Sequence, residues 1–364
     1  SVLYGTGALG GAVIVLLPQA RVDPGVGLKA RLGYDSASRG RNGAAVLNAS
    51  EGEHALMLGA SLADIGDYSA PGGRQALTGY GSNSFIGQYR YRLDGRQQLR
   101  VSLQQQSDRD VWYPGSAKPH PVAAVGRLTI HSPEQTRRLA EVGYNRQGTG
   151  DQPLNLDVRV YRQQMQRQIN AWGSLLARDI VLNDVGFITD GLDARADWLV
   201  HPRHLLSLGL NAWRMTANPD SRMAAPPAFA AFAPSKPFTD GALRATGVYA
   251  QDDMQFGALS VLAGLRYDRV STSAVDMANH TVSTGLDRSD GALSGSIGAV
   301  YEVVPLLRPF ANLSRGFRAP DLRERYQSGA RNDGFFWAGS PQLKPEHAMQ
   351  FELGLKGSDA TLED

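Results

Sequence analysis

Period-two alternation of apolar and polar residues is the feature that most restricts how this 364-residue chain can fold. Beyond Ala20 the alternation recurs in one short segment after another, as in the stretch 98–104, which reads QLRVSLQ. Successive side chains of a β-strand point to opposite faces, so this pattern is typical of strands with one apolar and one polar face. Helical periodicity is scarce, and we therefore predict an all-β chain.

The lengths of the connections restrict the fold further. We predict fourteen strands, near residues 27–36, 40–50, 54–64, 84–93, 98–107, 137–147, 154–168, 191–201, 204–216, 242–255, 259–272, 291–303, 308–318 and 347–357. Tight connections with Gly or Pro alternate with long ones, near 65–83, 108–136, 169–190, 217–241, 273–290 and 319–346. Short turns at one end and long loops at the other are typical of a transmembrane antiparallel β-barrel. A closed barrel also lets every strand find a hydrogen-bonding partner where lipid offers none.

Composition excludes several other classes of protein. The chain has no cysteine, so disulfide frameworks and thiolate metal sites are excluded. Its 37 basic and 35 acidic residues form no basic block, so we expect no nucleic-acid partner. No apolar run approaches the ~20 residues of a membrane helix. We find no nucleophile, base and orienting group together, and we expect no enzyme, no cofactor and no metal site.

The opening stretch LYGTGALGG contains G-x-G-x-x-G at residues 5–10. A dinucleotide-binding loop with this pattern requires a strand before it and a helix after it. The residues that follow, AVIVLLP, are β-branched, short and ended by proline, which favours a buried strand. The glycines therefore require an explanation other than a dinucleotide-binding loop.

Three stretches together resemble the TonB-dependent outer-membrane receptors. The first, with Tyr4, Gly5, Gly7, Gly10 and Gly11, resembles the end of the plug domain in that family. This resemblance implies that the glycines let the backbone turn tightly in a crowded interior, where a Cβ would clash. The second is Phe317-Arg318-Ala319-Pro320, similar to the family's Phe/Tyr-Arg-Ala-Pro box. The third contains Pro341, Leu343, Pro345 and Glu346 and is similar to its Asn-Pro-x-Leu-x-Pro-Glu box, with Ser340 in place of the usual Asn.

The resemblance implies a domain organisation. Residues 1–20 would be the C-terminal end of a plug domain, and residues 21–364 the N-terminal part of the barrel. Barrels of this type have about 22 strands, so roughly eight would follow Asp364, while the TonB-contacting segment and most of the plug would precede Ser1. Because the piece alone would leave two unpaired edges, we expect that it does not insert into a membrane as a monomer.

The resemblance also implies active import across the outer membrane of a Gram-negative cell, by a receptor that is monomeric when complete. Its partners would be the TonB energy-transducing complex, outer-membrane lipid and an extracellular ligand. A ferric siderophore is the family's commonest cargo and is our expectation; haem, cobalamin, copper or a saccharide are alternatives. Haem receptors of the family carry a histidine between the two boxes, and residues 318–346 contain none. A passive porin would lack the Gly-rich plug segment, and a soluble β-propeller or sandwich would show blade repeats or loops of equal length at both ends.

Ligand contacts are expected in the long loops, because loops on a rigid scaffold carry binding. The candidates are aromatic side chains, which supply contact area, and an arginine, which can pair with an anionic iron chelate: Trp112, Tyr113, Tyr326, Arg331, Phe335, Phe336 and Trp337. The alternative is that Phe335, Phe336 and Trp337 pack the loop onto itself. The two boxes are expected to act structurally: Asp321 and Glu324 would form a capping box for a short helical turn, and Pro341 and Pro345 would hold the returning segment extended.

Overall fold

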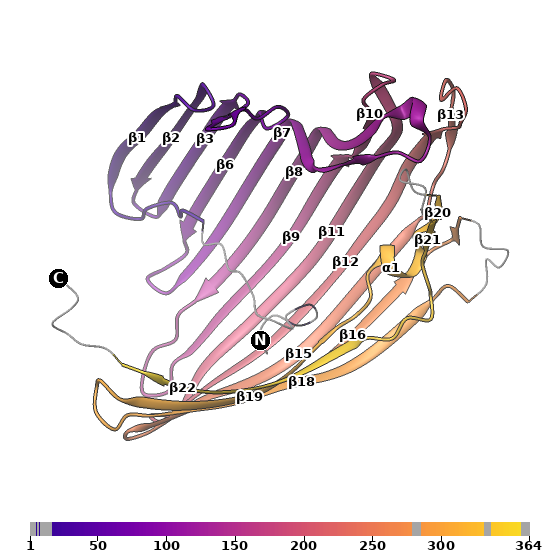
Figure 1. Cartoon of the computed structure of the whole chain (residues 1–364). Coiled ribbons are helices and arrows are strands. Elements are labelled where there is room, and N and C mark those ends of the chain that lie inside the picture. Colours follow the sequence, from indigo (N-terminus) through magenta and orange to yellow (C-terminus); the bar gives the residue numbers. More distant parts are fainter. Residues whose placement is uncertain (1–4, 6, 8–16, 279–284, 331–335, 358–364) are drawn as a thin grey trace.

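One antiparallel sheet makes up nearly all of the molecule. The computed structural model describes residues 5, 7, 17–278, 285–330 and 336–357. Figure 1 shows the sheet as a row of tilted strands that curves around an interior, from β1 at one edge to β22 at the other. Its strands are β1 (Gly25–Asp35), β2 (Gly40–Glu51), β3 (His54–Ile65), β6 (Tyr80–Arg92), β7 (Gln97–Pro119), β8 (Arg127–Arg146), β9 (Leu154–Gln168), β10 (Asn170–Gly173), β11 (Arg178–His201), β12 (His204–Ala224), β15 (Gly241–Phe256), β16 (Leu259–Ser273), β18 (Arg288–Tyr301), β19 (Arg308–Arg318) and β22 (Glu346–Lys356).

The remaining elements lie in the connections. The short strands are β4 (Ser69–Ala70), β5 (Gly73–Arg74), β13 (Phe232–Pro234), β14 (Phe238–Thr239), β17 (Asp276–Met277), β20 (Ser328–Ala330) and β21 (Phe336–Ala338). The helical elements are the 3₁₀ turn η1 (Ala123–Val125) and the helix α1 (Leu322–Tyr326). Within the described ranges, no helix is long and apolar enough to cross a membrane.

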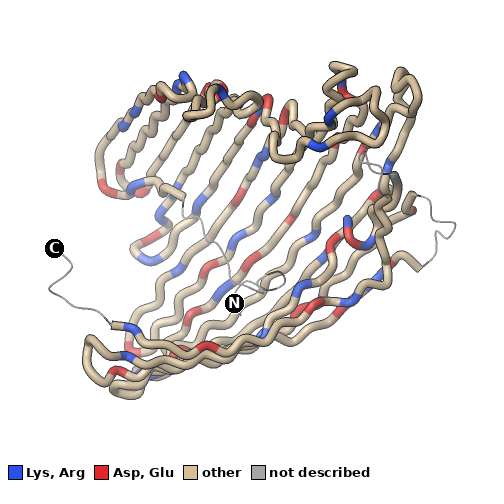
Figure 2. The backbone as a smooth tube through the Cα atoms, in the orientation of Figure 1, with Lys and Arg blue, Asp and Glu red and all other residues tan. Residues whose placement is uncertain are grey.

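The two faces of the sheet differ as the alternation predicts. On β16, Leu265 and Tyr267 are 62% and 51% exposed, whereas Arg266 and Asp268, which point the other way, are 4% and 1% exposed. The same alternation of exposure is seen on β3 and β15, whereas the edge strands β1 and β22 are exposed on both faces. The sheet thus has an apolar outer face and a polar lumenal face. Charged residues therefore recur along the strands as well as in the turns (Figure 2).

The prediction of fourteen strands is confirmed. The path from β1 to β22 contains fourteen strands, with β9 and β10 sharing one position between β8 and β11. The predicted loops 108–136, 169–190 and 217–241 are shorter than expected, because β7, β8, β11 and β12 extend into them. At the loop ends of these strands, apolar and polar residues no longer alternate, but the backbones continue to pair. The sequence pattern therefore underestimated strand length at the loop end.

The first residues of the described chain lie against the lumenal face. Ala20 is fully buried; its N–H donates to Gln88 Oε1 at 2.8 Å, and Arg90 donates to its carbonyl at 2.7 Å. Gly5 has φ +68°, and a Cβ there would lie 2.7 Å from Arg266 Nη2, as the crowded-interior interpretation requires. Gly7 has φ +94° but open space around its Cβ position, so only its backbone conformation favours glycine. Tyr4, Gly10 and Gly11 lie outside the described residues.

Candidate ligand site at the mouth of the barrel

Arg318, at the loop end of β19, joins the two sequence boxes. Its guanidinium donates to both carboxylate oxygens of Glu324, at 2.8 and 2.9 Å, and to both oxygens of Glu346, at 3.0 and 2.8 Å. Arginine suits this arrangement because its planar fork can bind carboxylates in a bidentate manner. The Arg of the first box is thus tied to the Glu of the second, which fixes where the connection leaves and re-enters the sheet.

The predicted capping box is present. Asp321 accepts a hydrogen bond from the Glu324 N–H at 2.8 Å, and Glu324 Oε2 accepts one from the Asp321 N–H at 2.9 Å. These two bonds satisfy backbone donors that the first turn of α1 would leave unpaired. The hydrogen bonds from Arg318, followed in importance by the one from the Asp321 N–H, hold the pKa of the Glu324 carboxyl below its usual range against the opposing effect of burial.

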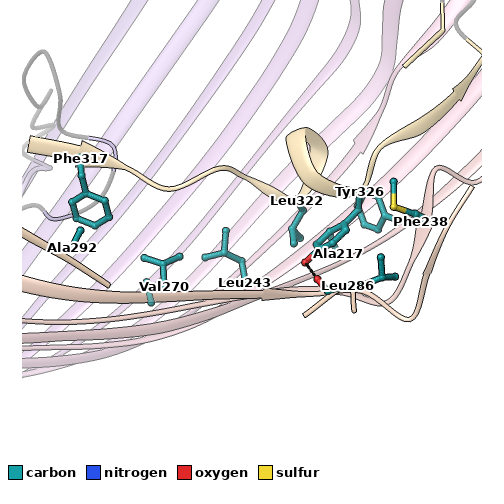
Figure 3. Close-up of a cluster of buried hydrophobic side chains, with 11 residues drawn as sticks. Ala217, Phe238, Leu243, Val270, Leu286, Ala292, Phe317, Leu322 and Tyr326 are labelled. Atoms are coloured by element: carbon teal, nitrogen blue, oxygen red, sulfur yellow. Dashed lines mark hydrogen bonds between the residues drawn. The ribbon is translucent and has the colours of Figure 1, made fainter. Parts of the chain in front are cut away.

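Helix α1 is docked onto the lumenal wall by two consecutive buried residues. Arg325 is 1% exposed and donates to Thr272 Oγ1 and Asp290 Oδ2, both at 2.6 Å, and to the Leu343 carbonyl at 3.0 Å. The Tyr326 hydroxyl is hydrogen-bonded to the Leu286 carbonyl at 2.6 Å and to Thr272 Oγ1 at 3.0 Å. Figure 3 shows Tyr326 and Leu322 reaching from α1 into a row of apolar side chains on the wall. The structure therefore places Tyr326 in this buried cluster, away from any exposed part of the loop.

A cavity of about 570 Å³ lies between this docked connection and the extended rims of β7, β8, β11 and β12. Three cationic side chains line it: Lys118 from β7, Lys236 from the connection between β13 and β14, and Arg323 from α1. No carboxylate belongs to the described residues that line it. Leu128, Ile130, Ile169, Val181, Met223 and Trp337 provide its apolar wall. The cavity can thus hold a molecule that is anionic and partly apolar.

Trp337 is the predicted aromatic residue that reaches this cavity. It is 37% exposed, and the Arg323 guanidinium lies over its ring at 5.5 Å, in cation–π geometry. Phe336, its neighbour on β21, is 58% exposed and does not line the cavity. Arg331 and Phe335 lie outside the described residues.

Trp112 and Tyr113 lie on β7, not in a loop as expected, because the strand continues to Pro119. Trp112 stacks on His131 with ring centroids 4.3 Å apart, and its ring does not line the cavity. Tyr113 accepts a hydrogen bond from Arg167 Nη2 at 3.1 Å on the opposite face of the strand. The two neighbours therefore belong to different environments, as alternation along a strand requires.

A second cavity, of about 380 Å³, lies deeper on the lumenal face. Arg266 and Asp268 border it as a buried pair with donor–acceptor distances of 2.7 to 2.9 Å, and Arg266 also donates to Asn211 at 2.7 Å. A Cβ on Gly247 would overlap both members of the pair, so glycine is required for them to lie flat against β15. Among the described residues, no group of three or more His, Asp or Glu side chains is placed to hold a metal ion.

The sequence singled out Trp337 but missed the three cations of the mouth. Lys118, Lys236 and Arg323 are far apart in the chain and carry no local motif. The only signal that could have found them is their place near the ends of strands or in long connections, which many other charged residues share.

The fold and this mouth define a large antiparallel β-barrel wall with a loop-covered, cation-lined entrance. The family model described as TonB dependent receptor-like, β-barrel, matches residues 31–363, and the chain belongs to this family. The resemblance seen in the three stretches is therefore confirmed at the level of the family. Its members are transport receptors of the outer membrane.

Individual relatives support the same assignment. The chain is 24% identical to a Yersinia pestis protein named hemin receptor over 387 residues, which cover 99% of this chain and 52% of that protein. It is 35% identical to hemoglobin-haptoglobin utilization protein B of Neisseria meningitidis over 103 residues, 26% of this chain and 13% of that protein. The chain thus spans about half the length of the relative that it matches from end to end.

Solved structures show the fold. The copper transporter OprC superimposes with a TM-score of 0.76 at 15% identity, over 94% of this chain and 52% of that chain. A double mutant of the Serratia marcescens hemophore receptor HasR, solved with its hemophore HasA and heme, gives 0.70 at 18% identity, over 92% and 52% of the two chains.

Proposed function

We propose that the whole protein imports an anionic iron chelate through a plugged barrel, with energy supplied through TonB. In this proposal residues 1–20 are the end of the plug and residues 21–364 the first part of the barrel. The observation that carries the choice of ligand is the mouth cavity, which combines Lys118, Lys236 and Arg323 with an apolar wall and no carboxylate among its described lining residues. Its volume of about 570 Å³ lies within the ~300–1,000 Å³ of small-molecule sites.

A ferric siderophore is the first candidate ligand. Many iron chelates carry carboxylate or catecholate oxygens with net negative charge, and cationic side chains in a partly desolvated site bind such groups strongly. The Arg323–Trp337 pair adds a flat surface against which an aromatic group of the chelate can lie.

Haem is the second candidate, because proteins named hemin receptor match nearly the whole chain. A porphyrin is apolar and carries two carboxylates, so it also fits the chemistry of the mouth. Against haem, neither the segment 318–346 nor the described lining of the cavity contains a histidine to bind the iron.

Growth of an iron-starved Gram-negative host that expresses the full-length protein tests the proposal. A panel of ferric siderophores and haem is supplied, each as sole iron source, in strains with and without TonB. We expect growth on one siderophore, and only with TonB. Uptake that persists without TonB would identify a passive porin, growth on haem alone would select the second candidate, and growth on neither would refute the iron proposal.

The contribution of the mouth is tested with the variant Lys118→Gln/Lys236→Gln. We expect ligand affinity to fall about tenfold or more, since charge-assisted contacts to the anion are lost. The matched control is Arg96→Gln/Arg146→Gln, which removes two positive charges from the short-turn end of β7 and β8. Equal affinity in the two variants would show that the ligand binds elsewhere.

A further inference from the structure

Three glycines on neighbouring strands underlie the second cavity, the one of about 380 Å³ on the lumenal face. They are Gly191 on β11, Gly209 on β12 and Gly247 on β15, and we call them the wall glycines. Gly247 lines the cavity, and the other two are each two residues from a lining residue, Asp193 or Asn211, so all three belong to the lumenal face. Glycine weakens the interior of a strand, and there it often marks a site where another group approaches closely.

A bulky side chain from the adjacent strand lies over each wall glycine. Tyr161 of β9 is the Cα partner of Gly191, and Tyr249 of β15 is the Cα partner of Gly209. A Cβ on either glycine would overlap the phenol ring of its partner, just as a Cβ on Gly247 would overlap the buried ion pair of β16. Both tyrosines line the cavity. The glycines therefore let the rings lie flat along the wall, and an alanine would push each ring into the lumen.

The charges around the second cavity are balanced, unlike those of the mouth. Arg159 donates to Asp193 Oδ2 and Arg195 donates to Asp197 Oδ1, both at 2.8 Å. The charged residues in the described lining are three arginines and three aspartates: Arg159, Arg195, Arg266, Asp157, Asp193 and Asp268. An anion is held by charge-assisted contacts at the mouth, where three cations face no carboxylate among the described lining residues, but it meets no excess positive charge here. The second cavity therefore favours passage of an anion over its retention.

The two cavities lie in line along the same two strands. β11 contributes Asn183 to the mouth cavity and Asp193 to the second one, and β12 contributes Ser221 and Asn211 in the same order. The members of each pair are ten positions apart, which corresponds to about 33 Å along a strand at ~3.3 Å per residue. A straight path from the mouth toward the short-turn end of β11 and β12 therefore runs past the wall glycines.

We propose that the imported chelate passes along this part of the wall, and that the wall glycines determine the largest chelate that can pass. The inference rests on the proposed function, because the occupant of the second cavity is the same anionic chelate in transit. Gly5, from the segment assigned to the plug, lies beside Arg266 at the edge of this cavity, so the cavity lies where plug and wall meet. A flat wall leaves room for a bulky chelate at this boundary, whereas two projecting phenol rings would narrow it.

The test uses the full-length receptor in an iron-starved host with TonB. Ferric citrate, a ferric tris-catecholate and haemin, each with radioactive iron, are the probes, and the import rate is measured separately from the affinity of de-energised cells. The variants are Gly209→Ala, Tyr249→Ala and the double variant that combines them. The control is Gly143→Ala on β8, the Cα partner of Arg159, because a Cβ at this glycine would make only an ordinary contact, 3.4 Å from Arg100 Nη2.

Gly209→Ala should lower the import rate of the accepted probe several-fold and leave its affinity unchanged, because the alanine drives the Tyr249 ring into the passage. The double variant, which lacks the ring, should regain the wild-type rate, and Tyr249→Ala and the control should import at least as fast as wild type. A loss of import through misfolding would not be rescued in this way. Normal import by Gly209→Ala, or no recovery in the double variant, would overturn the inference and leave the proposed function intact. If wild type imports none of the probes, the proposed function itself fails, and this inference with it.

A second measurement applies if Gly209→Ala does not reach the outer membrane. Asn211→Cys places a thiol in the floor of the cavity, and it is labelled on intact cells with maleimides of increasing size after the barrel has folded. We expect import to fall stepwise as the label grows, with unchanged affinity at the mouth. A thiol that does not react would show that the cavity is filled in the full-length receptor, and normal import with the largest label attached would place the passage elsewhere; either result would overturn the inference.

Discussion

Substitution of Arg325 by methionine should undock the connection between β19 and β22 without unfolding the barrel. The change keeps a long side chain but replaces the charged guanidinium by an apolar thioether. All three hydrogen bonds are removed, which leaves Asp290 Oδ2, Thr272 Oγ1 and the Leu343 carbonyl without this donor. Removing one partner of a buried ion pair costs about 3–5 kcal/mol. Because the Asp290 side chain is 20% exposed and water replaces part of the loss, we place the cost at about 3 kcal/mol.

A cost of about 3 kcal/mol raises the undocked population about 100-fold. The assay is amide hydrogen exchange on the full-length receptor, followed at N–H groups that are protected only when the connection is docked. These are Gln327, which donates to the Arg323 carbonyl, and Gly339 and Ser340, which donate to the Gln327 and Glu324 carbonyls. Their exchange should accelerate by about two orders of magnitude, while exchange in the sheet stays unchanged.

Arg323→Met is the matched control. It is on the same helix and loses the same charge, but Arg323 is exposed, and its contacts within the described ranges are with Gln327 and the Trp337 ring, so its removal should cost no more than about 1 kcal/mol. Similar exchange in Arg325→Met and wild type would refute the reasoning, since it would show that the buried pair does not hold the connection.

Three further outcomes are expected. The pKa of Glu324 is lowered in the folded protein, so the stability that comes from its bonds to Arg318 is complete above the unfolded pKa and is lost as pH falls through the lowered value. Amide hydrogen exchange at α1 should therefore rise only below about pH 4.5, and a rise that begins near pH 6 would contradict this. Gly5→Ala should displace Arg266 and lower Tm of the full receptor, whereas an unchanged Tm would show that Gly5 does not pack there. Trp337→Ala should weaken binding of the imported chelate several-fold in an equilibrium titration, and unchanged affinity would remove this ring from the ligand site.

Strand number and type followed from local patterns, whereas strand ends did not. Period-two alternation and turn chemistry located all fourteen wall strands, because a strand between lipid and lumen must alternate along its own sequence. At the loop ends of the strands, apolar residues no longer alternate with polar ones, although the backbone continues to pair. For this reason Trp112 and Tyr113 were expected in a loop, whereas they lie on β7. Tyr326 was expected at the mouth and is buried, because only the docked helix shows which way it points.

The sequence by itself determined the all-β class, the family boxes and the Asp321–Glu324 capping box, since each depends on residues within a few positions of one another. Only the tertiary structure decided the contacts between distant residues. Arg318 reaches Glu346 across 28 positions, and the mouth brings Lys118, Lys236 and Arg323 around one cavity. Strand register determines which residues of neighbouring strands lie side by side, and a shift of one residue would turn every side chain of a strand to the other face. The pairing of Arg214 with Arg244 on the outer face also depends on register, because the sequence of either strand alone does not determine which residue lies opposite.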